Sequence, residues 1–308
     1  MKVLSSSNSY AIDTLNLLND QGIFVNRQVL ISADDFGLSV EVNEAIEQAH
    51  RQGILSTANL MIAGAAAEDA IQRAKRLPNL KVGLHLVVIE GPSVLPYSEI
   101  PLIVNSNNLF PSDQLRMGID YFFKKPIQHQ LRKEIRAQIQ TFIDTGLVLD
   151  HIDVHKHMHL HPSVGKMLIE ISKEFGVRNI RVPHEPVKTL MAIDNTTYKE
   201  NIGNLLVQYW TSILKYQLRR ANMRYLDWCF GLSWCGHMKF DKISKLLHNL
   251  PKGRSEIFFH PSISHSGLYQ NLMPDYEPTK ELEALCHPDF PKILKENNIT
   301  PITWDNVH

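Results

Sequence analysis

Two adjacent carboxylates are the first residues in this sequence that are suited to chemistry. Asp34 and Asp35 end an apolar stretch and are followed by Phe36 and Gly37. Neighbouring side chains of an extended chain point to opposite sides, so one carboxylate can bind a metal ion while the other accepts a proton. A turn in which one Asp caps the next helix is the structural alternative.

A single histidine, His85, interrupts a second apolar stretch at residues 82–87. An imidazole in such a strand is either a hydrogen-bonded core residue or a metal ligand. This residue alone does not separate the two interpretations.

Histidine and aspartate alternate along a third segment, which comprises His151, Asp153, His155, His157, His159 and His161. In an extended chain every second side chain lies on the same face, where imidazoles and a carboxylate suit a divalent ion. Six groups cannot all bind one metal, and we expect the chain to leave the strand after about His155. The later histidines would then line a loop, contact substrate or support the ligands. A histidine-rich surface tract that binds metals loosely is the alternative.

Two further polar residues, Arg181 and His260, each follow a short apolar stretch. Singly, such an arginine can pair with a surface acid, and a histidine before proline can shape a turn. However, all of the groups named so far lie at or near the carboxyl end of an expected strand. In a β/α barrel these ends open onto one face, where catalytic groups gather.

The elements that position these groups alternate between β-rich runs and amphipathic segments. We predict strands at residues 28–33, 57–62, 81–87, 149–154, 178–182, 224–230, 256–259 and 300–304, and helices at residues 42–51, 65–76, 127–144, 163–175, 200–221, 239–249 and 278–285. Residues 90–111 and 183–197 are expected to be long functional loops. The pattern favours an α/β fold, an irregular (β/α) TIM-like barrel with seven or eight strands, over a doubly wound open sheet. We assign residues 1–27 to an N-terminal extension and residues 28–308 to a single barrel domain.

Composition narrows the class of protein. The 308 residues include 32 Lys+Arg and 32 Asp+Glu, a balance that disfavours nucleic-acid binding. The three cysteines, Cys229, Cys235 and Cys286, lack the spacing of a zinc ribbon or a disulfide framework, which favours a reducing compartment. We find no secretory signal and no membrane span, so we predict a cytoplasmic protein. The sequence is compatible with a homo-oligomer.

These motifs together resemble those of the YdjC-like carbohydrate deacetylase family. The resemblance rests on ADDFG (33–37), GLHL (83–86), HIDVHKHMHLHP (151–162), RVP (181–183) and HPS (260–262), and it covers residues 28–304. The stretches VGLHLVVIEGPSVLP and YFFKKPIQHQLRKEIRAQIQ are similar to the hopanoid biosynthesis-associated branch of that family.

The resemblance implies a (β/α) barrel that uses a divalent metal to hydrolyse the N-acetyl group of an amino sugar. By the same motifs, Asp34 would be the general base, and the metal ligands would be Asp35, His85 and His155. The family implies Mg²⁺, whereas imidazole ligands favour Zn²⁺. For the remaining catalytic roles we expect His260 to protonate the leaving nitrogen, and Arg181 to keep the base charged or to contact substrate.

The branch implies an N-acetylglucosaminyl hopanoid lipid as the acceptor, with a soluble chitooligosaccharide as the alternative. Bulky apolar residues at 117–125 and 205–210, with Lys124 and Lys125 beside them, indicate a peripheral contact with the inner membrane, although ordinary packing explains them as well. The ligand types also allow a metal-dependent phosphoesterase or amidohydrolase. A non-catalytic metal- or sugar-binding protein is disfavoured, because binding needs no second carboxylate at Asp34–Asp35.

Overall fold

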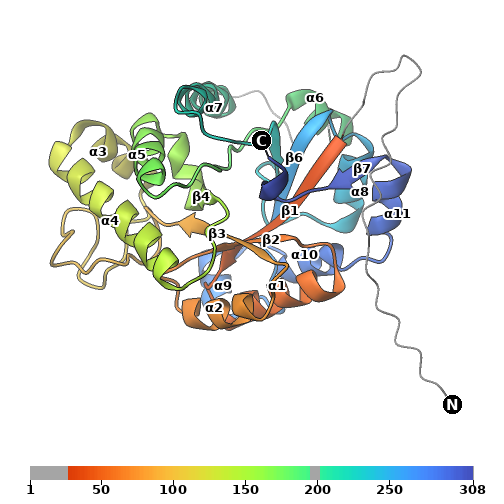
Figure 1. Ribbon diagram of the computed structural model, residues 1–308, viewed down its shortest axis with the longest axis horizontal. Helices are drawn as coiled ribbons and strands as arrows, with labels where there is room; N and C mark the ends of the chain where they lie inside the picture. The colour runs from red at the N-terminus through yellow and green to blue at the C-terminus, as the bar shows by residue number, and fades with distance from the viewer. Residues whose placement is uncertain (1–26, 195–201, 308) are drawn as a thin grey trace.

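A curled parallel sheet organises the molecule. The computed structural model describes residues 27–194 and 202–307. Within them lie seven strands: β1 (Arg27–Phe36), β2 (Thr57–Leu60), β3 (Lys81–Leu86), β4 (Ile152–Val154), β5 (Trp228–Phe230), β6 (Gly253–Phe259) and β7 (Ile299–Pro301). Their order is β4-β3-β2-β1-β6-β5, and β7 pairs with β1 (Figure 1).

The first strand, β1, meets three others. It pairs with β6 along one edge from Arg27 to Ala33. Along the other edge its first residues pair with β7 and its last residues pair with β2. Eight of its ten residues are buried, because one face packs on helices and the other faces the inside of the curl.

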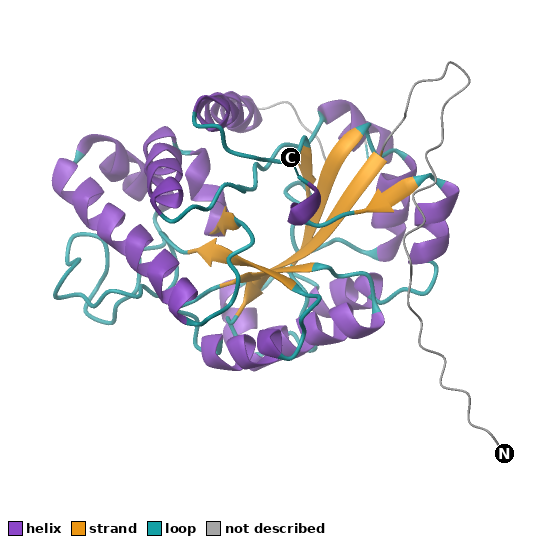
Figure 2. Ribbon diagram, viewed as in Figure 1, coloured by secondary structure: helices purple, strands orange, loops and turns teal. Residues whose placement is uncertain are grey.

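Helices cover the outer face of the sheet (Figure 2). The described helices are α1 (Val40–Gln52), α2 (Ala67–Lys75), α3 (Gln114–Phe123), α4 (Lys125–Asp144), α5 (Pro162–Glu174), α6 (Val187–Ile193), α7 (Ile202–Arg220), α8 (Phe240–His248), α9 (Gly267–Leu272), α10 (Pro278–Leu285) and α11 (Phe290–Glu296). Among them, α3 packs on α4 and α5 rather than on the sheet. Two 3₁₀ helices, η1 (His155–Leu160) and η2 (Trp304–Asn306), complete the described elements. The helix α1 is typical: the Ser39 side chain caps its first turn, and Val42, Ala45 and Ile46 lie on its buried face.

The predicted α/β fold with an irregular, barrel-like parallel sheet is confirmed, but the barrel is not closed, because the curled sheet ends at β4 and β5. The strand predicted at residues 178–182 forms only two isolated bridges between those ends, Ile152 with Ile180 and Asn179 with Arg224. Pro183 has no amide hydrogen to extend this ladder. The strand predicted at residues 224–230 is likewise reduced to β5.

The predicted loop at residues 90–111 contains no helix or strand, whereas the one at 183–197 includes α6 in its described part. Residues 1–26 and 195–201 lie outside the described residues, so the N-terminal extension and the start of the helix at 200–221 stay predictions. Within the described chain, no helix is long and apolar enough to cross a bilayer.

The inside of the curl changes from apolar to charged toward the carboxyl ends of the strands. At the amino-terminal end, a small buried cluster comprises Leu30, Leu226, Ile302, Trp304 and Val307. Two residues beyond Leu30 along β1, the Ser32 hydroxyl donates a 2.6 Å hydrogen bond to the buried carboxylate of Glu256. Polar groups therefore begin one layer above an apolar floor.

Candidate active site

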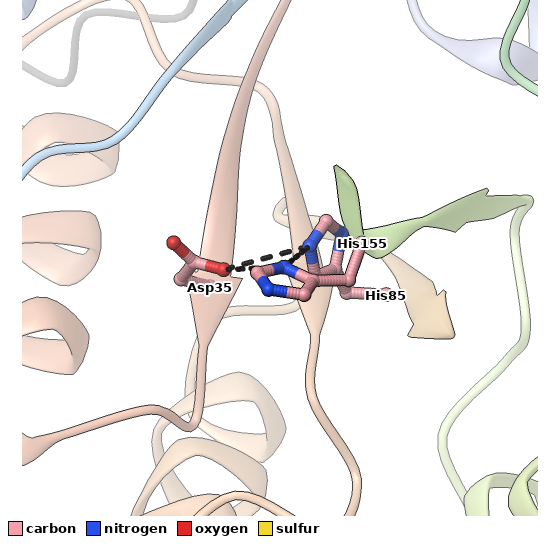
Figure 3. A group of neighbouring side chains, drawn as sticks. All are labelled: Asp35, His85 and His155. Carbon is pink, nitrogen blue, oxygen red and sulfur yellow. Dashed lines mark hydrogen bonds and ion pairs between the residues drawn. The ribbon is translucent and has the colours of Figure 1, made fainter. Parts of the chain in front are cut away.

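Three predicted metal ligands meet above this charged layer, and their side chains point toward one another (Figure 3). His85 Nε2 lies 3.5 Å from Asp35 Oδ1, and His155 Nδ1 lies 3.8 Å from the same oxygen. The two ring nitrogens are 3.2 Å apart. Asp35, His85 and His155 come from the ends of β1 and β3 and from the residue after β4, and are called the triad below.

The triad fits a divalent ion. Ligand atoms at 2.0–2.2 Å from a tetrahedral ion stand about 3.3–3.6 Å from one another, close to the separations of the three atoms. Asp35 Oδ1 is buried and has no hydrogen-bond partner, so an ion would supply the contact that it lacks. Three protein ligands leave further coordination positions for water or substrate.

The backbone at the end of β1 separates the two adjacent carboxylates. The register between β1 and β2 shifts between Ala33 and Phe36, which marks a bulge. Asp35 has a φ of 63°, in the left-handed region that non-glycine residues seldom adopt. This irregularity turns Asp35 toward the other two ligands of the triad. Asp34 instead contacts Arg181 and Asn59 inside the curl.

A buried arginine links the charged groups beneath the triad. Arg181 is fully buried and donates hydrogen bonds to Asp34 at 2.7 and 2.9 Å, to Asp153 at 2.6 Å and to Glu256 at 2.7 Å. Asp153 in turn contacts His85 Nδ1 at 2.7 Å and leaves His85 Nε2 facing the other ligands. One guanidinium therefore holds three carboxylates in place.

Buried charges shift the pKa values of two groups at the site in opposite directions: they lower that of Asp34 and raise that of His85. Burial raises the pKa of Asp34, but the charges of Arg181, His85 and His260 outweigh burial and hold it well below its usual range. Burial lowers the pKa of His85, yet the carboxylates of Asp153 and Asp34 raise it to about 9. The surroundings therefore stabilise positive charge at His85, whereas burial lowers the pKa of His155, the other imidazole of the triad, to about 4 and keeps it neutral, as a metal ligand must be.

The alternating histidines precede β4 or follow it in η1, and they lie at different depths. His151 stacks on Trp304 in the apolar floor, with ring centroids 5.1 Å apart. His157 lines the cavity described below, and the Nε2 of His159 contacts the Arg181 carbonyl oxygen at 2.9 Å. As predicted, the chain leaves the strand near His155: β4 ends at Val154 and η1 follows.

His260 follows β6 and lies across the site from Asp34. Its Nε2 is 3.9 Å from Asp34 Oδ2. The buried carboxylate of Glu281 accepts its backbone N–H at 2.5 Å, and the Tyr269 hydroxyl donates to its carbonyl oxygen at 2.8 Å. Burial lowers the pKa of His260, but Cys235 and the carboxylates of Asp35 and Asp34 raise it well above its ordinary value.

A cavity of about 800 Å³ opens over these groups. Its apolar walls include Leu38, Met61, Phe110, Leu232, Leu268, Leu272 and Met273, and its polar wall includes Asp34, Asp35, His85, His155, His157, His260, Cys235 and Tyr276. The loop predicted to be functional at residues 90–111 supplies part of the wall. Three further residues of the site, Cys235, Tyr276 and the buried Glu256, were not predicted from the sequence. A lone acid in an otherwise apolar strand was the available signal for Glu256.

The family of this chain follows from its similarity to known proteins. The family model described as YdjC-like protein matches residues 28–296. The chain belongs to the YdjC family. A carbohydrate deacetylase of Oceanobacillus iheyensis is 30% identical over 86% of this chain and 98% of its own length. A carbohydrate deacetylase of Clostridium beijerinckii is 26% identical over 91% of this chain and 100% of its own length.

A solved structure has the same fold as this YdjC family member. It is a protein of Enterococcus faecalis V583 named for cellobiose-phosphate cleavage. The two chains superpose with a TM-score of 0.70 at 18% identity, over 91% of this chain and 98% of the other. At that identity the likeness shows the fold alone.

Proposed function

We propose that this YdjC family member is a metal-dependent carbohydrate deacetylase that hydrolyses the N-acetyl group of an amino sugar. The observation that carries the proposal is the placement of the triad, Asp34 and His260 around one cavity. The names of the relatives support this reaction over the phosphoesterase and amidohydrolase alternatives.

Each residue of the site has a separate role in amide hydrolysis. A divalent ion bound by the triad would polarise the acetyl carbonyl and acidify a water molecule. Arg181 keeps Asp34 ionised, so this carboxylate accepts the proton of the attacking water. His260, across from Asp34, donates a proton to the leaving nitrogen, which is a poor leaving group without it. Asp153 fixes the orientation of His85 through its Nδ1.

The chemistry of the ligands bears on which ion is bound. Two imidazoles and one carboxylate at nearly tetrahedral separations favour Zn²⁺, whereas the resemblance to the family implies Mg²⁺. Removal of bound metal with a chelator, followed by separate addition of the two ions, decides between them by the recovery of acetate release.

We further propose that the acceptor is an amino sugar attached to an apolar lipid, with the N-acetylglucosaminyl hopanoid as the specific lipid implied by the sequence resemblance. The supporting observation is the apolar wall of the cavity, which continues to its rim. There Leu109, Leu268 and Leu272 are at least 40% exposed although they are large and apolar. A soluble sugar fragment would leave this surface in contact with water.

A cytoplasmic location with peripheral contact at the inner membrane completes the proposal. Tyr121 does not contribute to this contact, because it is buried and its hydroxyl binds the Val88 carbonyl. By contrast Phe123 and Tyr209 are 73% and 63% exposed. The ammonium group of Lys124 pairs with the carboxylate of Asp120 at 2.6 Å, so Lys125 is the better candidate of the two lysines to bind anionic lipid.

Acetate release tests both levels of the proposal. The metal-loaded protein is assayed with the glycosylated hopanoid in mixed micelles and with N,N′-diacetylchitobiose in solution, at the same pH. Acetate release with a higher kcat/KM for the hopanoid is the expected result. Equal or higher efficiency on chitobiose would contradict the lipid acceptor and retain the deacetylase, whereas phosphate release from phosphate esters without any acetate release would contradict the deacetylase itself.

A further inference from the structure

One polar contact beside the cavity has no part in the mechanism above. Cys235 Sγ lies 3.7 Å from Nδ1 of His260 and 2.9 Å from the hydroxyl of Tyr276. The other ring nitrogen of His260, Nε2, faces Asp34 at 3.9 Å. His260 therefore presents one nitrogen to the reacting groups and the other to a sulfur atom.

The segment that carries Cys235 is fixed on both sides. Before it, the Glu185 carboxylate accepts the backbone N–H groups of Gly231, Leu232 and Ser233. After it, Gly236 has a φ of 76°, and a Cβ at this position would come within 2.3 Å of the Tyr276 ring. Only a glycine combines this backbone with this close approach, so the ring packs directly against the segment.

The nearby carboxylates already bind other groups. Glu281 accepts the backbone N–H groups of His260 and Met238, at 2.5 and 2.9 Å. Asp34 is held by Arg181. The sulfur of Cys235 thus occupies the place at which a histidine usually meets a carboxylate or carbonyl oxygen that fixes its ring.

We propose that Cys235 is a positioning residue for His260, whose Nδ1–H donates a hydrogen bond to the sulfur. The proton on Nε2 then points toward the leaving nitrogen. As the C–N bond breaks, this proton moves to nitrogen, and the neutral ring keeps its Nδ1 proton and its contact with sulfur. The Tyr276 hydroxyl holds the sulfur from the other side. The inference rests on the proposed function, in which His260 protonates the amine.

The test separates positioning of an acid from general damage to the site. Cys235→Ala removes the acceptor, Cys235→Ser replaces it with oxygen, and Cys286→Ala is the matched control at a cysteine that does not line the cavity. Each metal-loaded variant is assayed on an N-acetyl amino sugar, whose amine must be protonated, and on 4-nitrophenyl acetate, whose leaving group needs no proton. Thermal unfolding shows whether each variant is folded.

We expect Cys235→Ala to lower kcat on the amide by roughly 10–100-fold with little change in KM, the range seen when a group that orients an active residue is removed. Hydrolysis of the ester should stay close to that of the wild type. Cys235→Ser should recover most of kcat, and Cys286→Ala should match the wild type. Equal losses on amide and ester, or an unchanged kcat on the amide, would overturn the assignment.

A measurement without turnover keeps the inference independent of the proposed function. The ¹⁵N NMR signals of His260, assigned with a His260→Gln variant, report which ring nitrogen carries hydrogen. At a pH at which the ring is neutral, we expect the proton to stay on Nδ1 in the wild type and to be shared between Nδ1 and Nε2 in Cys235→Ala. Identical signals in the two proteins would overturn the contact. If the wild type released no acetate from any N-acetyl sugar, the proposed function would fail and this spectrum would still decide the contact.

Discussion

The two halves of the site are built in different ways. The metal half, formed by the triad with Asp34 and Arg181, stands on strand ends and is braced by charged side chains inside the curled sheet. The acid half, formed by His260, Cys235 and Tyr276, stands on segments after β5 and β6. There the carboxylates of Glu185 and Glu281 accept mainly backbone N–H groups, and Glu185 also accepts the hydroxyl of Ser233.

Because of this difference, the metal half should contribute more to the stability of the fold, and the acid half should contribute more to the rate of turnover. The braces of the metal half link four strands or strand ends, so their loss affects the whole fold. The braces of the acid half fix short segments near the surface, so their loss moves a few catalytic atoms. We therefore expect substitutions of the triad or of Arg181 to lower metal content or the free energy of unfolding. Substitutions in the second half, and that of the base Asp34, should lower turnover.

The largest effect should come from the triad itself. Simultaneous replacement of Asp35, His85 and His155 by alanine removes every proposed ligand, so bound metal measured by elemental analysis should fall from one ion per chain to almost none, and acetate release should disappear. The exposed His248, replaced by alanine, is the control that keeps the metal. A folded triple variant with a full complement of metal would place the ion elsewhere.

Removal of the central brace should cost the most stability. Arg181→Met leaves Asp34, Asp153 and Glu256 without their shared cation, and breaking a buried ion pair costs about 3–5 kcal/mol of unfolding free energy. Arg132→Met breaks only the half-exposed pair with Glu170 and should cost less than about 1 kcal/mol. Urea unfolding measures both values. Similar values for the two variants would show that the buried arginine stabilises the fold no more than a surface ion pair does.

The base should affect turnover without affecting the metal. Asp34→Asn keeps the shape of the side chain but cannot accept a proton, so kcat should fall by about 10²-fold or more. Metal content, measured on the same preparation, should equal that of the wild type. Undiminished acetate release would exclude Asp34 as the base.

Acid should weaken the metal half through His159. Burial lowers the pKa of this histidine to about 4, whereas its ordinary value is 6.5. The unfolded chain therefore binds a proton more readily, and the stability present above pH 6.5 is lost as the pH falls toward 4. Between pH 7 and pH 5 the loss should be about 2 kcal/mol.

The matched variant for this pH effect is His159→Gln, which can still donate to the Arg181 carbonyl but does not titrate. Urea unfolding at the two pH values should show a smaller loss in the variant than in the wild type, by about the same 2 kcal/mol. Parallel losses in both proteins would assign the acid sensitivity to other groups.

The smallest effect should come from the brace of the acid half. Glu185→Gln retains one acceptor oxygen but loses the charge, so stability should fall by only about 1 kcal/mol. Because the segment from Gly231 to Gly236 then moves more freely, kcat should fall more clearly than the melting temperature. A stability loss as large as that of Arg181→Met would show that both halves support the core equally.

The two halves also differ in how far the sequence predicts them. The ligands of the metal half follow strand ends or a period of two, which indicates a shared face. That pattern does not specify depth, so His151 could not be separated from His155, although one stacks on Trp304 and the other joins the triad. The gap in the barrel between β4 and β5 was also not predicted, because residues 178–182 have the composition of a strand.

The acid half was predictable only through His260. Cys235 and Tyr276 belong to segments without periodicity, and they meet through a turn whose geometry depends on Gly236 and on Glu185, many residues earlier. Arg181 and Glu256, 75 residues apart, illustrate the same limit. Arg181 was predicted from the sequence to be a site residue and Glu256 was not, and only the curled sheet brings the two into contact.

The arrangement around β1 has a consequence for how the protein is made. This strand is synthesised well before its partners β6 and β7, which are among the last described elements of the chain. At ribosomal speeds of about 5–20 residues per second, the roughly 220 residues between β1 and β6 take about 10–45 s to emerge. For that time one edge of a buried, apolar strand has no neighbour, which makes the nascent chain a natural client for chaperones and its yield sensitive to the rate of translation.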